Sequence, residues 1–426
     1  MVADPHTLVV LNPGHFHAAL TLRRRHPRLS DEVHVYAEDG PELESFLAIV
    51  RSFNERALDP TRWKLRVYRG ADYLERLRAE RAGDVVVIAG RNNARMKAIH
   101  TLHADRFLVL GDKPWLIASD QLAMLREVCA STPLAMDIMT ERHDVANRLQ
   151  RALAAQPELF GRFRADGDEP AIEIRSVHHL YKTVNQRPLV RPPWYFDVAV
   201  QGTGITDVTT HLVDLTQWWV DDGKPFDYDR DVELLWARQW PTSVPRGIFT
   251  QITGLPHFPQ ALQGRVSGDE LSYLCNAQLS YRLRGIGVQL EALWHLAIPQ
   301  GGADSHWAIL RGTKADLIVE QGPGTAFRAE LRLHPIGPGD HAARVKHAVA
   351  SLQKRFPGLG IQPAGSAFHI TIPEALRSTH EEHFSAVLDH FLSVVDRGHW
   401  PDKLAADLVM KYTLLARAAE LSRVGN

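Results

Sequence analysis

Short apolar runs alternate with helical segments through the first 140 residues, and this alternation limits the possible folds more than any other feature. The predicted strands occupy residues 7–11, 33–37, 63–68, 84–89, 106–110 and 134–139. A short apolar run such as residues 7–11 is typical of a strand that is buried on both faces. Strands that alternate with helices of about 10 to 15 residues indicate parallel crossover units. We therefore predict an α/β fold that begins with a doubly wound, mostly parallel sheet.

The first apolar run leads into a turn with the sequence Asn12-Pro13-Gly14-His15-Phe16-His17. Such sheets bind dinucleotides at this turn, where glycines and a helix N-terminus approach the pyrophosphate. Gly14 matches the second glycine of that fingerprint, whereas Asn12 and His17 replace the first and third. We expect Asn12, Gly14, His15 and Phe16 to contact the cofactor.

Two further polar residues follow later strands. Glu38 ends the second apolar run, at the position where an acid accepts hydrogen bonds from the ribose hydroxyls of NAD. A carboxylate there repels a 2′-phosphate, so the sequence favours NAD over NADP. Asn92 follows the fourth apolar run and is expected to contact the ribose or the nicotinamide.

The pattern changes after about residue 140. Longer alternating segments occupy residues 171–181, 231–240, 271–283, 287–295, 306–311 and 315–320. Alternation of this kind is typical of antiparallel strands with one half-polar face. Helical periodicity returns over residues 373–424. We predict a first domain over residues 1–140 and an α+β domain over 141–426, with a large, mostly antiparallel open sheet and C-terminal helices.

The stretch 206–219 has apolar residues at helical spacing and three polar residues on one face. Asp207, His211 and Asp214 are four and three positions apart, so a helix places them together. An imidazole oriented by a carboxylate can transfer protons. Spacing alone also allows an N-cap aspartate followed by a solvated polar face.

Taken together, these segments resemble the Gfo/Idh/MocA oxidoreductases. The resemblance rests on Gly14, on Gly111-Asp112-Lys113-Pro114 and on the Asp-x-x-x-His pattern of Asp207 and His211. Asp112 replaces the glutamate of the family's Glu-Lys-Pro motif. Segments 14–18, 137–142 and 176–179 are similar to a subgroup known only as oxidoreductases. The resemblance implies an N-terminal Rossmann domain, dependence on NAD or NADP, and substrates such as sugars, inositols and other polyols.

The resemblance also implies roles for single residues. Lys113 would bind the reacting hydroxyl or ketone beside the nicotinamide, His211 would be the general acid/base, and Asp207 would be its partner or a substrate ligand. These roles are chemically consistent, because alcohol oxidation removes a proton as hydride leaves. A lysine ammonium stabilises the developing alkoxide.

Candidate substrate residues precede the stretch 206–219. Aromatic rings stack on sugar faces and arginine donates to hydroxyls, so Arg191, Trp194 and Tyr195 are candidates, although a loop packed by its own aromatic side chains fits equally well. His178 and His179 end a predicted strand and point to opposite faces. We take His179 as the substrate candidate, without evidence from the sequence for which of the two faces a pocket.

Three other functions remain open at this point. Bound NAD could assist cleavage or elimination of a glycoside with no net redox change. His15 and His17 resemble the opening metal motif of barrel hydrolases, and His178, His179, His211 and Asp207 would complete such a site. A cofactor-binding sensor without turnover is the third alternative.

Composition limits which partners and which cellular compartment we expect. The chain has 426 residues, a formal net charge of −1 and two cysteines, Cys129 and Cys275. The near-neutral charge favours neither nucleic acid nor an anionic membrane as a partner, and two distant cysteines form no disulfide framework. We expect a cytoplasmic enzyme with a small-molecule substrate and no metal. Since one sheet face needs cover, we also expect a homo-oligomer.

Overall fold

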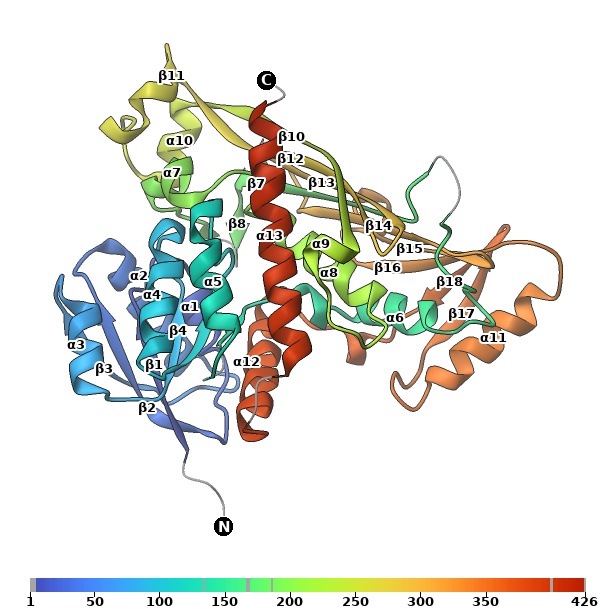
Figure 1. Ribbon diagram of the computed structural model, residues 1–426, viewed down its shortest axis with the longest axis horizontal. Coiled ribbons are helices and arrows are strands. Elements are labelled where there is room, and N and C mark those ends of the chain that lie inside the picture. Colours follow the sequence, from blue (N-terminus) through green and yellow to red (C-terminus); the bar gives the residue numbers. More distant parts are fainter. Residues whose placement is uncertain (1–4, 133–134, 166–168, 185–186, 399–400, 425–426) are drawn as a thin grey trace. The chain divides into compact units, whose positions relative to one another are not determined.

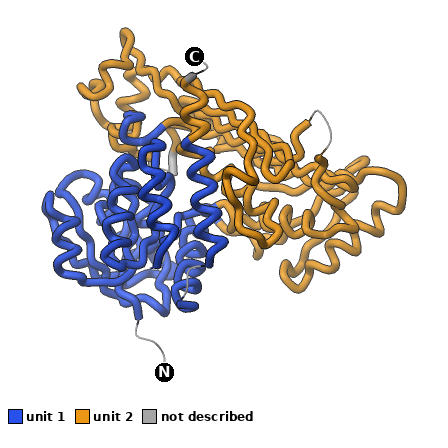
Figure 2. The backbone as a smooth tube through the Cα atoms, in the orientation of Figure 1, with its two compact units in different colours: residues 1–140, 197–202, 379–416 blue, residues 141–196, 203–378, 417–426 orange. Residues whose placement is uncertain are grey.

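The computed structural model describes residues 5–132, 135–165, 169–184, 187–398 and 401–424. The chain forms two compact units, each built from segments that are distant in the sequence (Figure 2). The first unit contains residues 1–140, 197–202 and 379–416, and the second contains 141–196, 203–378 and 417–426. Among the described residues, no helix is both long enough and apolar enough to cross a membrane.

The first unit is built on a six-stranded parallel sheet in the order β3-β2-β1-β4-β5-β6 (Figure 1). Its strands are β1 (His6–Leu11), β2 (Leu29–Ala37), β3 (Lys64–Arg69), β4 (Val85–Ile88), β5 (Leu108–Gly111) and β6 (Ala135–Asp137). The strand order reverses between β1 and β4, which is where doubly wound sheets bind ligands. The predicted doubly wound sheet is confirmed.

Helices lie on both faces of this sheet. They are α1 (His17–Leu20), α2 (Pro41–Glu55), α3 (Tyr73–Glu80), α4 (Asn92–Ala104), α5 (Leu122–Cys129), α7 (Val198–Gln201), α12 (His380–Asp396) and most of α13 (Asp402–Val424). The placement of α12 differs from the expected division of the chain after residue 140. Phe384, Val387 and Phe391 of α12 pack into the same core as Leu8 and Val10 of β1. Helical spacing reveals a buried face but not the core that buries it.

The second unit is built on a ten-stranded sheet in the order β10-β12-β13-β7-β14-β15-β16-β18-β17, with β11 paired to β12. Its strands are β7 (Ile172–Tyr181), β10 (Val232–Pro245), β11 (Val266–Ser267), β12 (Glu270–Leu283), β13 (Ile286–Ala297), β14 (Ser305–Arg311), β15 (Ala315–Gln321), β16 (Glu330–Pro335), β17 (Gly360–Ala364) and β18 (Ala367–Thr371). Strands β7 and β13 pair in parallel and the other neighbouring strands pair antiparallel, so the predicted mostly antiparallel sheet is confirmed. A separate hairpin joins β8 (Thr183–Val184) to β9 (Arg187–Pro188).

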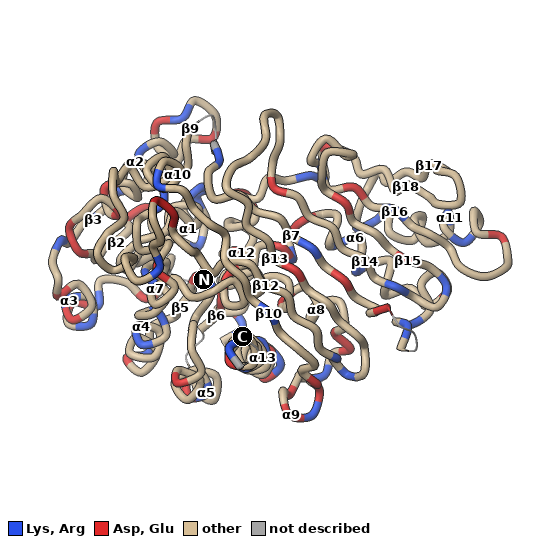
Figure 3. Tube along the Cα trace, turned by 90° about the horizontal axis from the view of Figure 1, so that it is seen from above, with Lys and Arg blue, Asp and Glu red and all other residues tan. Residues whose placement is uncertain are grey.

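The two faces of this large sheet differ in polarity. Along β7, Ile172 and Ile174 are buried, whereas Glu173 and Arg175 on the other face are more exposed. The helices of the unit are α6 (Val145–Ala154), α8 (Thr209–Val220), α9 (Tyr228–Asp231), α10 (Arg246–Thr253) and α11 (His341–Leu352). Basic and acidic residues are interspersed along the middle strands, including β7 and β13 (Figure 3). Since Glu173 and Arg175 lie on the more exposed face, which we call the open face, this face carries polar residues, as the alternation predicts.

Candidate active site

The turn after β1 departs from the usual glycine turn. Asn12 has a φ of 43°, a left-handed conformation that asparagine tolerates better than most residues. The amides of Gly14 and His15 donate within the protein, to Asn12 O and Ala89 O, each at 2.8 Å. Asn12 thus takes the conformation that the missing first glycine would provide, and two of the turn's amides are not directed at a ligand.

Asp112 links the end of β5 to this turn. His17 Nδ1 lies 3.0 Å from Asp112 Oδ1, His15 Nδ1 lies 3.2 Å from Oδ2, and the Lys113 amide donates to Oδ1 at 2.9 Å. Burial lowers the pKa of His17 to about 3. Although burial raises the pKa of Asp112, His17 and the hydrogen bonds from both imidazoles hold it well below its usual range. The ionised carboxylate accepts from both rings and positions them.

The segment that carries Lys113 is anchored on both sides. The Lys113–Pro114 peptide is cis, and Arg95 Nη1 donates to Pro114 O at 2.7 Å. The buried Trp115 ring stacks on Tyr412 of α13 with centroids 6.0 Å apart, and its Nε1 donates to Gly111 O at 3.2 Å. Lys113 itself is only half-buried at the carboxyl end of the sheet.

Glu38 and Asn92 differ in how available their polar atoms are. Glu38 is exposed just beyond β2, and its charge contributes to raising the pKa of Tyr73, after the larger effect of burial. Asn92 is the first residue of α4 and is buried. Its Nδ2 donates to Gln201 O at 2.7 Å and to Gln201 Oε1 at 3.1 Å, so its amide group holds α7 in the first unit.

In the second unit, Asp207 lies in a turn rather than on the helix predicted for residues 206–219. Helix α8 begins at Thr209, and the buried Asp207 precedes it. A Cβ on Gly204 would collide with the Cys275 carbonyl, so this approach to β12 requires glycine. Half-buried His211 follows in the first turn of α8.

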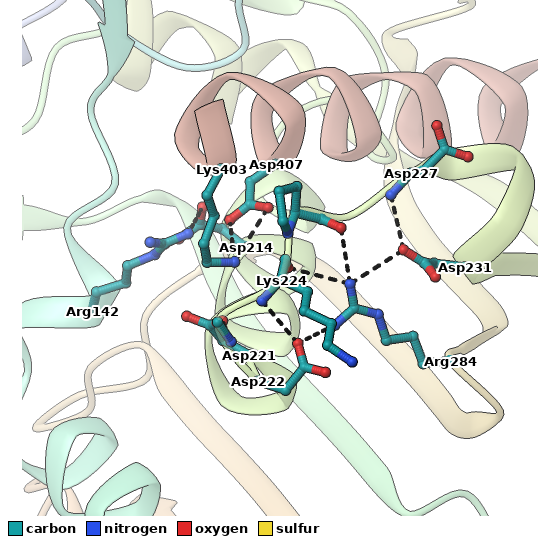
Figure 4. A network of polar contacts seen from close by, with 12 residues as sticks. Arg142, Asp214, Asp221, Asp222, Lys224, Asp227, Asp231, Arg284, Lys403 and Asp407 are labelled. Carbon is teal, nitrogen blue, oxygen red and sulfur yellow. Dashed lines mark hydrogen bonds and ion pairs between the residues drawn. The ribbon is translucent and has the colours of Figure 1, made fainter. Parts of the chain in front are cut away.

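Asp214 takes part in an ion pair that its spacing in the sequence did not predict. Arg142 Nε and Nη2 donate to Asp214 Oδ2 and Oδ1 at 2.5 and 2.7 Å, in a two-pronged ion pair (Figure 4). The carboxylate is buried, and one guanidinium donates to both of its oxygens. The sequence pattern could not reveal this partner, which is 72 positions away.

Arg191 and Tyr195 are buried in an aromatic cluster on the covered face of the large sheet, as expected for a loop packed by its own aromatic side chains. The Arg191 guanidinium lies 4.4 Å from the Tyr195 ring centroid and 5.3 Å from that of Trp294. Burial raises the pKa of Tyr195, and the charge of Asp207 raises it further. Asp207 is therefore near this cluster. Half-buried Trp194 shares the short helical turn of Tyr195, at residues Pro193–Phe196.

His178 and His179 lie on opposite faces of β7, as alternation predicts. The His178 ring is 5.1 Å from Trp294, whereas the His179 ring is 5.7 Å from His295. The structure thus groups His178, rather than the expected His179, with Arg191 and Tyr195. Trp294 is the member that sequence analysis missed, because only strand pairing brings it beside His178.

Both histidines also contact Asp304. His179 Nδ1 lies 3.0 Å from Asp304 Oδ1, and His178 Nδ1 lies 3.4 Å from Oδ2. Lys182 Nζ donates to the same carboxylate, and Ser176 Oγ lies 2.8 Å from His178 Nε2. Although burial raises the pKa of Asp304, the charges and hydrogen bonds of His178 and then Lys182 lower it below its usual range.

The barrel hydrolase alternative fails on the fold, because His15 follows a strand of an open, doubly wound sheet. Residues 149–423 match the family described as "Putative oxidoreductase C terminal domain". A crystal structure of a putative oxidoreductase from Parabacteroides merdae ATCC 43184 has 35% sequence identity and a TM-score of 0.96, with 100% of each chain covered. No curated protein sequence matches the chain.

More distant structures share the fold. GenD2 from gentamicin A biosynthesis, in complex with NAD, has 14% identity and a TM-score of 0.57, and covers 100% of this chain and 96% of its own. KijD10, a 3-ketoreductase from Actinomadura kijaniata in complex with TDP-benzene and NADP, has 12% identity and a TM-score of 0.57, with 98% of each chain covered. The match over residues 149–423 and the 35% identity to the Parabacteroides merdae structure identify the chain as a member of the oxidoreductase family that carries this C-terminal domain, which is of the Gfo/Idh/MocA type.

Proposed function

We propose that this oxidoreductase transfers hydride between NAD and a hydroxyl or ketone carbon of a sugar, polyol or glycoside. The observation that carries the proposal is the bond network of Asp112. It joins the end of β5 to the β1 turn, so the neighbouring Lys113 lies at the edge of the sheet where a dinucleotide binds.

The residues at this edge fit a dinucleotide. A Cβ on Gly90 would lie 2.8 Å from Asn12 O, so only glycine lets the ends of β1 and β4 approach so closely. The exposed Glu38 carboxylate is available to ribose hydroxyls and disfavours a 2′-phosphate. Bound NAD supplies the hydride acceptor. GenD2 binds NAD and KijD10 binds NADP, which supports a nicotinamide cofactor here.

In this proposal, residues of the chain transfer the hydroxyl proton and stabilise the negative charge on the substrate oxygen. Lys113 donates to the substrate oxygen and stabilises the alkoxide that forms as hydride leaves. His211 accepts the hydroxyl proton in oxidation and returns it in reduction. Asp207 is the partner of His211 or a ligand of a neighbouring hydroxyl.

Half-buried Trp194 is the candidate aromatic contact for a carbohydrate. Its neighbours Arg191, Tyr195 and Trp294 are buried against one another, and Arg191 Nε donates to Leu180 O at 3.3 Å. Trp194 can therefore stack on a sugar face, while the buried cluster supports its loop. The structural neighbour KijD10 is a 3-ketoreductase, which supports a reaction at a carbon that bears oxygen.

A panel of sugars, polyols and glycosides incubated with NAD tests this function. The expected result is NADH formation with at least one of them, together with the matching keto product by mass spectrometry. Glycoside cleavage without net NADH formation would establish the alternative, in which NAD is reduced and reoxidised within each turnover. Failure of the whole panel, with NAD bound but no product, would contradict both.

A further inference from the structure

We propose that His15, His17 and Asp112 form a binding site for one transition-metal cation in the first unit. The two histidines lie in the turn after β1, and the aspartate follows β5. Strand β4 lies between these two strands in the sheet. The three side chains therefore converge from separate elements at the carboxyl edge of the sheet.

The spacing of the donor atoms suits a shared ion. One nitrogen of each imidazole and one carboxylate oxygen all lie within 4.8 Å of one another. The Nδ1 atoms of His17 and His15 are 3.0 and 3.2 Å from the Asp112 oxygens. Two atoms that bind one zinc ion at about 2.0–2.1 Å are themselves roughly 3 Å apart. Coordination would therefore need only small side-chain movements.

The surroundings of Asp112 favour a cation. Its side chain is 2% exposed. Its hydrogen-bond donors among the described residues are two imidazoles and the Lys113 amide, while Arg95 acts on it at longer range. Buried carboxylates are normally paired with a cationic group or bound to a metal. A metal ion would supply the positive charge that the direct partners lack.

The packing of the rings keeps the site compact. The His15 and His17 centroids are only 3.9 Å apart, in an edge-to-face arrangement. Phe384 of α12 packs against His17 with centroids 4.5 Å apart. These contacts limit the rotation of His17, so its Nδ1 stays directed at Asp112. Rigid placement of ligands favours metal affinity.

The donor set also predicts which metals bind. Two imidazoles and one carboxylate suit Zn²⁺, Fe²⁺, Co²⁺ or Ni²⁺, whereas Mg²⁺ and Ca²⁺ prefer oxygen ligands throughout. Three protein ligands leave at least one position open for water or another oxygen. His15 is the most exposed of the three, with 21% of its side chain accessible, so the open position faces its side of the cluster.

The test uses untagged, chelator-stripped protein without nicotinamide cofactor. Zn²⁺ and, in a separate titration, Mg²⁺ are added and followed by calorimetry, and Co²⁺ is added and followed by visible absorption. The variants are His15→Ala and Asp112→Asn. His100→Ala is the matched control, because His100 pairs with the carboxylate of Glu127 at 2.7 Å on the surface of the same unit.

We expect one equivalent of Zn²⁺ per chain, no comparable binding of Mg²⁺, and cobalt absorption bands typical of nitrogen ligands. Each site variant should weaken Zn²⁺ binding by at least about a hundredfold, and His100→Ala should not. Equal Zn²⁺ affinity in the wild type and His15→Ala would overturn the proposal and leave Asp112 as a hydrogen-bonded anchor of the turn. If Asp112→Asn fails to fold by circular dichroism, His15→Ala decides, since its side chain is partly exposed.

Metal binding and the proposed function are tested separately. NAD affinity and product formation are measured on the same preparations before and after chelation. Protein that binds NAD but not Zn²⁺ would refute the metal site alone. Protein that binds Zn²⁺ but turns over no substrate would refute the proposed function alone.

Discussion

Lys113 and His211 are the residues whose chemistry matters most for the proposed hydride transfer. The structure holds the backbone of Lys113 through Pro114 and Trp115, while the Lys113 side chain stays half-buried. His211 is also half-buried, one turn beyond Asp207. Neither side chain is part of a close-packed core, so both can be changed without leaving a large cavity.

We expect His211→Asn and Lys113→Met each to lower kcat by about a hundredfold or more, the usual scale for losing acid–base catalysis or alkoxide stabilisation. Cofactor affinity and melting temperature should change little. Steady-state kinetics on the substrate found by the panel, with a thermal melt of each variant, measure both. Near-full turnover in either variant would show that the role assigned to that residue is wrong. Unfolding of both variants would show that Lys113 and His211 are needed for the fold rather than for the chemical step.

Glu38 should set the cofactor preference. Glu38→Gln removes the charge that repels the 2′-phosphate of NADP. It should therefore reduce the preference for NAD over NADP by about tenfold, which corresponds to about 1.4 kcal/mol. Asp39→Asn is the control, since Asp39 pairs with Arg69 instead. Fluorescence titration with both cofactors measures the ratio. An unchanged ratio in Glu38→Gln, or an initial preference for NADP, would remove this role.

At the scale of elements, ion pairs between side chains distant in sequence hold helices and loops in place. Arg142 joins the short turn before α6 to Asp214 of α8. Asp304 joins the loop before β14 to the end of β7 through His178, His179 and Lys182. These carboxylates are buried or partly buried, which makes them more important for stability than surface pairs.

Asp214→Asn should destabilise the protein by about 3 kcal/mol, because it leaves the Arg142 guanidinium without its buried partner. Glu233→Gln breaks the exposed Glu233–Arg282 pair in the same unit and should change stability by less than about 1 kcal/mol. Urea unfolding followed by circular dichroism compares them. Equal urea midpoints for the two variants would mean that the Arg142–Asp214 ion pair contributes no more to stability than a surface pair.

The contribution of Asp304 should depend on pH. Its pKa in the folded protein is lowered, so its stabilising effect is full above the unfolded value of about 4 and is lost as pH falls below it. Asp304→Asn should therefore be less stable than wild type near neutral pH, and the difference should shrink on acidification. Glu158→Gln, at an exposed pair with Lys314, should show no such trend. A difference that is constant with pH would contradict the assignment.

At the scale of the whole molecule, the open face of the large sheet is where we expect a second copy of the chain to bind. Glu173, Arg175, Gln289, Glu291 and Trp307 line a hollow of about 380 Å³ there. Such a face is a candidate contact between copies of the chain.

We predict a homo-oligomer of at least twice the chain mass of 47.8 kDa. Light scattering at micromolar concentration measures the mass, and a monomer would contradict the prediction. Trp307→Glu places a charge on the open face and should shift the equilibrium toward smaller species. An unchanged mass in that variant would mean that the contact lies elsewhere.

Much of the architecture and chemistry could be predicted from the sequence. Apolar runs located the strands of the first sheet, and alternation located β7, β10 and β12 to β15 within a few residues. The segments around Lys113 and His211 indicated the family. These predictions succeeded because strand periodicity and short motifs are local properties, encoded within about ten consecutive residues.

The tertiary structure alone decided which distant segments meet. Local spacing cannot show that α12 packs with β1, that β7 pairs in parallel with β13, or that Asp214 is bound by Arg142. It also could not show that His178, rather than His179, lies beside Trp294, or that one carboxylate holds both His15 and His17. Each of these contacts depends on the packing of whole elements, because burial and ion pairing are settled only when separate parts of the chain share one core.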